Sequence, residues 1–263
     1  MDTPSYHLGA MRDAAPLVQN ITNYVAMNVM ANVLLAAGAS PAMVHARGEA
    51  AEFARIASAL SINIGTLDDE WIECMAIAAD AAREAGTPWV LDPVAVGATA
   101  MRREAGARLL ALGPRVVRGN ASEILALSGA EAAGRGADAA DAVENAEDAA
   151  RDLARRTGAV VIATGPVDFA TDGSRIARIR NGHAMMPRVT VMGCSLTGLI
   201  AAFVAPADDA FEASVAALAH YGYAGEIAAR EAKGPGSFQV AFLDALHAID
   251  GPGLDAAARI ERA

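Results

Sequence analysis

The sequence predicts an α/β fold with a mostly parallel central sheet, helices on both faces and one inserted β-hairpin. Short apolar runs alternate with helical patterns along most of the chain, which is typical of βαβ units. Within residues 169–179, two strand-like runs flank the pair Asp172-Gly173, which favours a tight hairpin turn. The chain has 263 residues, 54% hydrophobic and 20% charged, enough to bury a core without disulfides. We expect one α/β domain over residues 1–263.

The individual elements are located by their hydrophobic period and by the residues that end them, as Gly38 ends a first helix. The predicted strands, besides the hairpin, are 42–44, 60–65, 89–91, 115–118 and 159–163. The predicted helices are 20–37, 49–59, 69–85, 102–111, 121–127, 141–156, 195–204, 209–232 and 235–248. The segment Ser128–Asp141 is rich in Gly and Asp, and we interpret it as a flexible surface connection in preference to a functional lid.

Charge and cysteine content restrict the partners and the compartment. The net charge of -10 and a pI near 4.9 argue against binding to nucleic acid or to anionic membranes by bulk charge. Residues 1–15 contain two aspartates and no apolar core, so they do not resemble a signal peptide. The most apolar stretches, 24–44 and 192–206, are interrupted or too short to cross a membrane. Two cysteines suit a reducing compartment, and we expect a cytoplasmic protein.

Polar residues follow several of the predicted strands. In an open parallel sheet, ligands bind beyond the carboxyl ends of the strands, so these residues are candidates for a shared site. They are Asp92, Arg118, Glu123, Thr164 and the pair Gly193-Cys194. An acid, a base, a second acid, a hydroxyl and a helix start on one edge predict a polar ligand site there.

The pair Gly193-Cys194 is expected at the start of a helix. Glycine allows the backbone to approach a ligand closely, and the free N–H groups of a helix N-terminus bind anions. A cysteine at that place is expected to face the ligand and to have a lowered pKa. The alternative is a small buried cysteine that only packs at the helix start.

The two acids have structural alternatives of their own. Asp92 precedes Pro93, which favours an extended backbone and a side chain pointing off the strand end, but a turn or cap role fits as well. Asn120 and Glu123 have the spacing of a capping box, an interpretation as strong as metal binding. Together, Asp92 and Glu123 near an anion-binding helix suit Mg²⁺ coordination through water and phosphate.

Arg118, at a strand end, is a candidate for a phosphate fork, with a surface ion pair as the alternative. The sequence contains no Gly-x-x-x-x-Gly-Lys-Ser/Thr loop and no Gly-x-Gly-x-x-Gly after its first strand. These motifs therefore indicate neither a P-loop enzyme nor a Rossmann dehydrogenase.

Seven segments in order resemble the hydroxyethylthiazole kinases, which belong to the ribokinase-like family of small-molecule kinases. The resemblance extends over nearly the whole chain. The segments are Gln19–Val25, Gly38–Met43, Ile62–Thr66, Leu91–Thr99, Arg118–Glu123, Ala163–Asp168 and Gly234–Phe238. The resemblance implies a ribokinase-like fold and transfer of the ATP γ-phosphate to the primary hydroxyl of 4-methyl-5-(2-hydroxyethyl)thiazole, in thiamine biosynthesis or salvage. It also implies Mg²⁺, and a homotrimer with active sites at the subunit interfaces.

The same resemblance assigns roles to residues of this chain. It implies that Cys194 is catalytic, at the place where sugar kinases keep an aspartate base. It implies that ATP is held by Arg118 and Thr164, and that Asp92 and Glu123 lie near Mg²⁺ and phosphate. The residues implied for the thiazole pocket are Asn23, Met43, Val191 and Gly193.

The sequence departs from the family at one of these positions. The family usually has Thr-Gly-x-Gly-Cys before the helix, whereas this chain has Thr190-Val191-Met192-Gly193-Cys194. If the first glycine has φ > 0, valine there either shifts the loop or narrows the pocket. Two alternative functions therefore stay open: a kinase for another small alcohol, of the pyridoxal or hydroxymethylpyrimidine type, or a ligand-binding homologue with weak catalysis.

Overall fold

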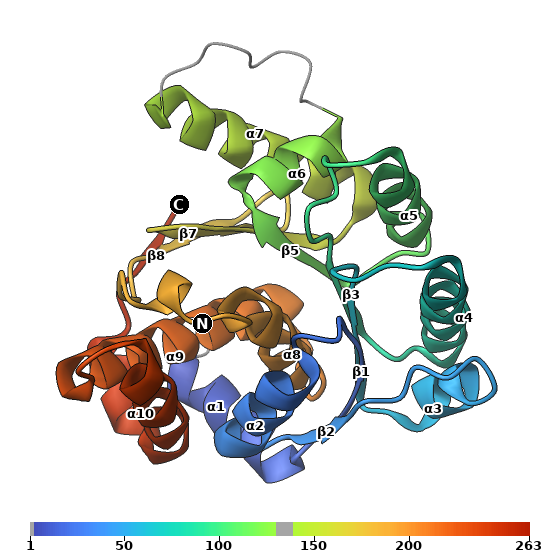
Figure 1. The fold of residues 1–263 in the computed structure, drawn as a ribbon. Coiled ribbons are helices and arrows are strands. Elements are labelled where there is room, and N and C mark those ends of the chain that lie inside the picture. The colour runs from blue at the N-terminus through green and yellow to red at the C-terminus, as the bar shows by residue number, and fades with distance from the viewer. Residues whose placement is uncertain (1–2, 130–138) are drawn as a thin grey trace.

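The computed structural model describes residues 3–129 and 139–263, and only the backbone of 139–144. The strands of the described residues form one nine-stranded sheet (Figure 1). The strand order is β2-β1-β3-β4-β5-β6-β7-β8-β9. The parallel strands are β1 (Leu17–Ile21), β2 (Ser40–Ala42), β3 (Ala59–Asn63), β4 (Trp89–Asp92), β5 (Val116–Asn120) and β6 (Val160–Thr164). The antiparallel strands are β7 (Asp168–Thr171), β8 (Ile176–Ile179) and β9 (Ile260–Arg262). The predicted hairpin is thus confirmed, and it extends the sheet.

Helices cover both faces of the sheet and give two hydrophobic clusters (Figure 1). The larger cluster includes residues of α1 (Pro4–Ala14), α2 (Met27–Ala37), α8 (Met192–Val204), α9 (Ala210–Glu231), α10 (Pro235–Ala248) and α11 (Gly251–Ala257). The smaller cluster includes residues of α3 (Ala50–Ile56), α4 (Asp69–Ala85), α5 (Ala100–Leu110), α6 (Ala121–Ser128) and α7 (Ala139–Thr157). This is the mostly parallel, doubly covered α/β fold that the sequence predicts.

Helix α8 lies inside the molecule, between the sheet and the long helix α9 (Figure 1). From Ser195 to Val204 each of its residues is buried, so it is apolar on nearly all sides, as a helix in a protein core is. Its burial explains the apolar stretch at 192–206. No helix in the described part of the chain is both long and apolar enough to cross a membrane.

The first helix of the sequence prediction, 20–37, is wrong in its first half. Residues Leu17–Ile21 form β1, and the helix begins only at Met27. The strand was hidden by Gln19 and Asn20, two fully buried polar residues that break an apolar pattern. Gln19 Nε2 donates to the carbonyls of Val44 and Ala50, which compensates the burial of its amide N–H groups.

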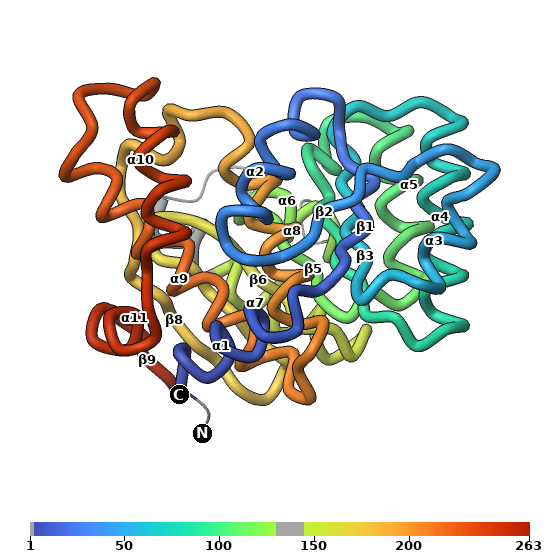
Figure 2. The backbone as a smooth tube through the Cα atoms, turned by 90° about the horizontal axis from the view of Figure 1, so that it is seen from below, coloured from blue at the N-terminus to red at the C-terminus, as the bar shows by residue number. Residues whose placement is uncertain are grey.

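Smaller differences concern the ends of the chain and one edge strand. The prediction lacks α1, α11 and β9, and it places β2 at 42–44 where the structure has Ser40–Ala42. Helix α1 lies beside α11, where the Ser5 backbone N–H and hydroxyl both donate to the Asp255 carboxylate (Figure 2). Of the predicted flexible loop Ser128–Asp141, residues 130–138 lie outside the described residues.

Candidate functional site

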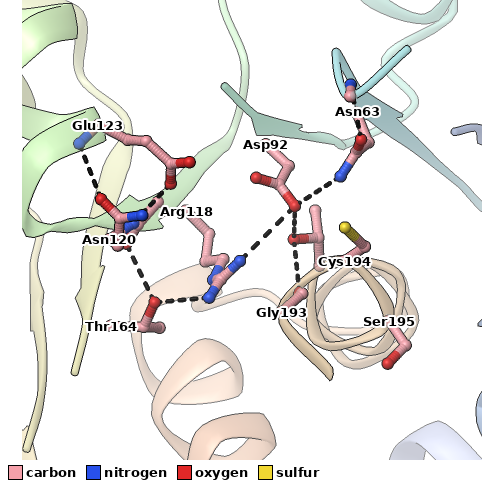
Figure 3. A network of polar contacts seen from close by, with 12 residues as sticks. Asn63, Asp92, Arg118, Asn120, Glu123, Thr164, Gly193, Cys194 and Ser195 are labelled. Carbon is pink, nitrogen blue, oxygen red and sulfur yellow. Dashed lines mark hydrogen bonds and ion pairs between the residues drawn. The ribbon is translucent and has the colours of Figure 1, made fainter. Parts of the chain in front are cut away.

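The carboxyl ends of four neighbouring strands bring the predicted polar residues together (Figure 3). Asn63 ends β3 and is paired in register with Asp92, which ends β4. Arg118 lies on β5, and Thr164 ends β6. The N-terminal turn of α8, with Gly193 and Cys194, faces this edge, whereas Ser195 lies on the opposite side of the helix. The hydrophobic period determines which segments form strands. Because these strands are parallel, their carboxyl ends and the polar residues that follow lie at one edge of the sheet.

Asp92 is fully buried, and its two carboxylate oxygens have different surroundings. Its Oδ2 accepts from Asn63 Nδ2 at 2.7 Å and from the Thr197 hydroxyl at 2.9 Å, and Arg118 Nη1 lies 3.6 Å away. Its Oδ1 has no hydrogen-bond partner. Burial raises the pKa of Asp92 to about 6, while Arg118 and the two hydrogen bonds oppose the rise. One oxygen is therefore fixed by the protein, whereas the other is buried without a partner.

Arg118 is only 9% exposed, so the alternative of a surface ion pair is wrong. Its Nη2 donates to the Thr164 hydroxyl at 2.5 Å, and its Nε has no partner. The guanidinium lies directly against α8, because a Cβ placed on Gly193 would be 2.9 Å from Nη1. Glycine at 193 is therefore required by the close approach of the arginine.

Glu123 forms the capping box of α6 that the sequence left as an alternative. Its Oε2 accepts from the backbone N–H of Asn120, whose side chain accepts from the Glu123 N–H. Its Oε1 accepts from the Ala95 N–H at 2.9 Å, in the loop after β4. Within the described ranges, no three His, Cys, Asp or Glu side chains cluster as a ready metal site. Glu123 therefore acts first as a link between α6 and that loop.

The N-terminus of α8 lies where the sequence predicts, although the helix begins at Met192 and not at Ser195. Val191 is its N-cap residue and has φ 74°, a left-handed conformation that a β-branched side chain rarely adopts. The valine thus keeps a backbone conformation that favours glycine, and the side chain is buried. The N–H groups of the first turn have no acceptor within the helix, so they suit an anion.

Cys194 corrects one prediction. Its pKa is raised, not lowered, because the thiol is buried and because the Asp92 carboxylate lies nearby. Asn23 Nδ2 lies 3.5 Å from Sγ, and Arg118 opposes the rise without reversing it. The sequence could locate the thiol at the helix start, but the buried acid beside it depends on tertiary packing.

Of the two remaining predicted residues, Asn23 lies in the polar network and Met43 lies away from it. Asn23 joins the polar network, since its Nδ2 donates to Asn63 Oδ1 at 2.8 Å. Met43 follows β2, which β1 separates from β3, and it packs partly against the larger hydrophobic cluster. The chain therefore brings Met43 to the same edge of the sheet, but two strands away from Asn63.

Sequence reasoning did not single out Asn63, Thr197 or Asp168. Asn63 ends the strand beside Asp92, and Thr197 lies one helical turn after Gly193, so both had a weak positional signal. Asp168 accepts from the Gly165 N–H at 2.9 Å, and burial raises its pKa to about 6, which the charge of Arg118 partly offsets. Its proximity to Arg118 follows from pairing of β6 with β7.

A helix N-terminus, an arginine and a buried carboxylate at the carboxyl edge of a parallel sheet form a site suited to phosphate groups. The fold matches that of small-molecule kinases: the structure of the pyridoxal kinase from Staphylococcus aureus in complex with AMP-PCP and pyridoxal aligns with a TM-score of 0.66 at 16% identity. The alignment covers 94% of this chain and 98% of that one. The fold is thus that of the ribokinase-like kinases.

Closer relatives narrow the class to one family. The model of the hydroxyethylthiazole kinase family matches residues 8–251. A hydroxyethylthiazole kinase of Cereibacter sphaeroides is 65% identical over 100% of both chains, and one of Rhizobium leguminosarum is 63% identical over 99% of this chain and 98% of its own. The structure of a hydroxyethylthiazole kinase protein from Pyrococcus horikoshii aligns with a TM-score of 0.92 at 41% identity, covering 99% of this chain and 98% of that one. The chain belongs to the hydroxyethylthiazole kinase family and is accordingly a kinase.

Proposed function

We propose that the protein transfers the γ-phosphate of ATP to the primary hydroxyl of 4-methyl-5-(2-hydroxyethyl)thiazole, a step of thiamine biosynthesis or salvage. The observation that carries the proposal is the meeting of Asp92, Arg118 and the first turn of α8 at one point. The relatives named hydroxyethylthiazole kinase supply the choice of alcohol. The alcohol and the phosphate donor would meet at the start of α8.

Arg118 and Thr164 are proposed to hold ATP. The planar guanidinium is already oriented by the Thr164 hydroxyl and by Gly193, which leaves its unpartnered Nε for an anion. The backbone N–H groups of Gly193 and Cys194 would stabilise the charge on the transferred group. Phosphoryl transfer has a loose transition state, so orientation and charge stabilisation supply most of the catalysis.

Cys194 is proposed to orient the alcohol at the transfer step. Because its pKa is raised, the group is a neutral thiol at pH 7 and a poor general base. Little proton removal is needed early in a loose transition state, so a thiol can serve there. Asn23, Met43, Val191 and Gly193 are proposed to complete the thiazole pocket.

Mg²⁺ is proposed as the cofactor, near Asp92. The fit rests on Asp92 Oδ1, a fully buried carboxylate oxygen without a partner, since such an atom is costly unless a donor or cation meets it. Glu123 fits less directly, because each of its oxygens already accepts a backbone N–H, and we assign it a role through water. When bound, Mg²⁺ would neutralise charge on the ATP phosphates.

A homotrimer with shared active sites is proposed for the assembly. Tyr24 and Val25 are 63% and 60% exposed, directly after Asn23 of the polar network. Apolar side chains beside a site are explained if a second copy covers them. Met43, distant from Asn63 within one chain, would then serve the pocket of a neighbouring copy.

Two further proposals concern the chain as a whole. We place the enzyme in the cytoplasm, which the two free cysteines support. We also propose that residues 1–263 act as one kinase domain, since all strands of the described residues belong to one sheet.

The test is ADP release with ATP, Mg²⁺ and a panel of alcohols: the thiazole alcohol, pyridoxal and hydroxymethylpyrimidine. The product is identified by mass spectrometry. We expect kcat/KM to be greatest for the thiazole alcohol. Turnover of another alcohol alone would favour the second kinase hypothesis, which rests on Val191. A thermal shift with ligand but no ADP release would favour the non-catalytic binder.

A further inference from the structure

Arg102, on α5, connects two loops that border the polar network. Its Nη1 donates to the Ile64 carbonyl at 2.6 Å and to the Val94 carbonyl at 2.8 Å, and its Nη2 donates to the Gly65 carbonyl at 2.5 Å. The side chain is partly buried, and its hydrogen bonds within the described residues all go to these main-chain carbonyls. A charged donor directed only at main-chain carbonyls ties chain segments together and does not serve an ion pair.

The first of these loops controls Asn63. Ile64 and Gly65 directly follow Asn63 at the end of β3. The Gly65 N–H donates to Asn63 Oδ1 at 2.9 Å, which turns the other end of that amide, Nδ2, toward Asp92 Oδ2. By holding the carbonyls of Ile64 and Gly65, Arg102 therefore fixes the Asn63 amide, which in turn fixes the Asp92 carboxylate.

The second loop controls Asp92 and Glu123. Val94 comes two residues after Asp92, and the next residue, Ala95, has φ 53°, which is unusual for a residue other than glycine. Such a conformation persists only where neighbouring contacts enforce it. The Ala95 N–H donates to Glu123 Oε1, so the same short loop reaches the second carboxylate.

We propose that Arg102 is a positioning residue: it locks the loops after β3 and β4 and so holds Asp92, through Asn63, and Glu123 in register for phosphoryl transfer. The proposal rests on the proposed function of these acids. The planar fork of arginine reaches three carbonyls at once, which the single ammonium group of lysine cannot reproduce. The Thr99 cap, whose hydroxyl accepts from the Arg102 N–H, sets the place of Arg102 in the first turn of α5.

The experiment compares Arg102→Gln and Arg102→Lys with Arg103→Gln. Arg103 is the matched control, because it is the next residue of α5, is exposed, and donates one bond to the Gly97 carbonyl. For each variant, circular dichroism and Tm are measured with kcat and with KM for alcohol and ATP. We expect Arg102→Gln to lower kcat about 10–100-fold while KM for the alcohol changes little, since a shift of about 1 Å has that effect. The kcat of Arg102→Lys should lie between those of Arg102→Gln and the wild type, and the kcat of Arg103→Gln should match the wild type.

A mutant cycle tests the route of the effect. If Arg102 acts through Asn63 and Glu123, Arg102→Gln should lower kcat much less in a background that carries both Asn63→Ala and Glu123→Ala than in the wild type. Effects that multiply independently, a change in KM or Tm without a change in kcat, or equality with Arg103→Gln would overturn the proposal. If Arg102→Gln does not fold, the lysine variant decides. Failure of the wild type to use the thiazole alcohol would refute the proposed function, and the cycle is then run with the alcohol that it does use.

Discussion

At the residue scale, Arg118 has two partners that belong to different parts of the site. It lies 3.6 Å from the buried Asp92 carboxylate and donates to Thr164, so it balances a buried negative charge and is oriented toward the proposed ATP site. Removing a cation from a buried pair leaves the acid uncompensated, which is more damaging than loss of a surface ion pair. Both stability and ATP binding are therefore sensitive at this position.

We expect Arg118→Ala to raise KM for ATP at least about tenfold and to change KM for the alcohol much less, because a charge-assisted fork is lost. It should also lower Tm, since Asp92 loses its nearest cation. Arg118→Lys keeps the charge without the planar fork and should recover only part of both losses. Steady-state kinetics and thermal unfolding check this. An unchanged KM for ATP in the folded alanine variant would remove Arg118 from the nucleotide site.

For Cys194, the raised pKa predicts that the thiolate is not the working form. Cys194→Ser should keep most of kcat, and Cys194→Ala should lower kcat by less than the 10²–10⁴-fold typical of a lost general base. The measurement is kcat from pH 7 to 9 for the wild type and the serine variant. A rise in kcat with pH that serine abolishes would restore the thiolate as base.

Val191 has a left-handed backbone conformation. At this position a glycine variant should therefore be more stable than an alanine variant, the reverse of the order in a helix interior. With φ near +74°, alanine remains strained and glycine does not, so Val191→Gly should be more stable than Val191→Ala by about 1 kcal/mol. Ala201→Gly in the middle of α8 is the control, where glycine should be the less stable residue by a similar amount. Denaturant unfolding of the three variants and the wild type gives the free energies. If alanine were more stable than glycine at both positions, the backbone at Val191 would not be strained.

At the scale of the elements, α9 contains a buried histidine that the site does not use. His220 is fully buried, 5.8 Å between ring centroids from Phe203 of α8. Burial, with the charge of Arg12, lowers its pKa to about 3. The packing of α8 and α9, which supports the site, therefore depends on a neutral imidazole.

The lowered pKa of His220 predicts acid sensitivity of the fold. An unfolded histidine has a pKa of about 6.5 and the folded one about 3, so between these values only the unfolded state binds the proton. Its contribution to the free energy of unfolding is lost as pH falls below about 6.5, by up to about 1.4 kcal/mol per pH unit. His220→Phe should flatten this part of the profile, measured by urea unfolding from pH 7 to 5. His247→Phe, at an exposed position of α10, should keep the wild-type slope, and equal slopes in all three proteins would contradict the prediction.

At the scale of the whole molecule, the proposed trimer predicts that a charge at the exposed Val25 disrupts assembly, whereas a charge at the exposed Ile56 does not. Val25→Glu places a charge beside the site, and we expect sedimentation to show a smaller species that has lost alcohol binding and kept ATP binding. Ile56→Glu is the control, since Ile56 is 67% exposed but ends α3 near the amino end of β3, away from the site. A wild-type monomer with full activity would refute the shared pocket.

Much of the fold and half of the site are predictable from local sequence. The βα alternation fixes a parallel sheet, and a parallel sheet brings Asp92, Arg118 and Thr164 to one edge, because every strand ends there. The capping box of α6 also follows from spacing alone, since Asn120 and Glu123 are one helical turn apart. These features depend on residues that are near each other in the chain or on a rule of topology.

Tertiary structure decided what depends on burial and on contacts between distant segments. β1 is a strand despite Gln19 and Asn20, and carbonyls far along the chain accept from Gln19 Nε2. Cys194 has a raised pKa because the fold buries its thiol, and Asp92, about a hundred residues earlier in the sequence, adds to the rise. Arg102 reaches three carbonyls of two loops without any pattern that marks it. Hydrophobic period determines which segments become strands and helices, but desolvation and charge are set only when those segments pack together.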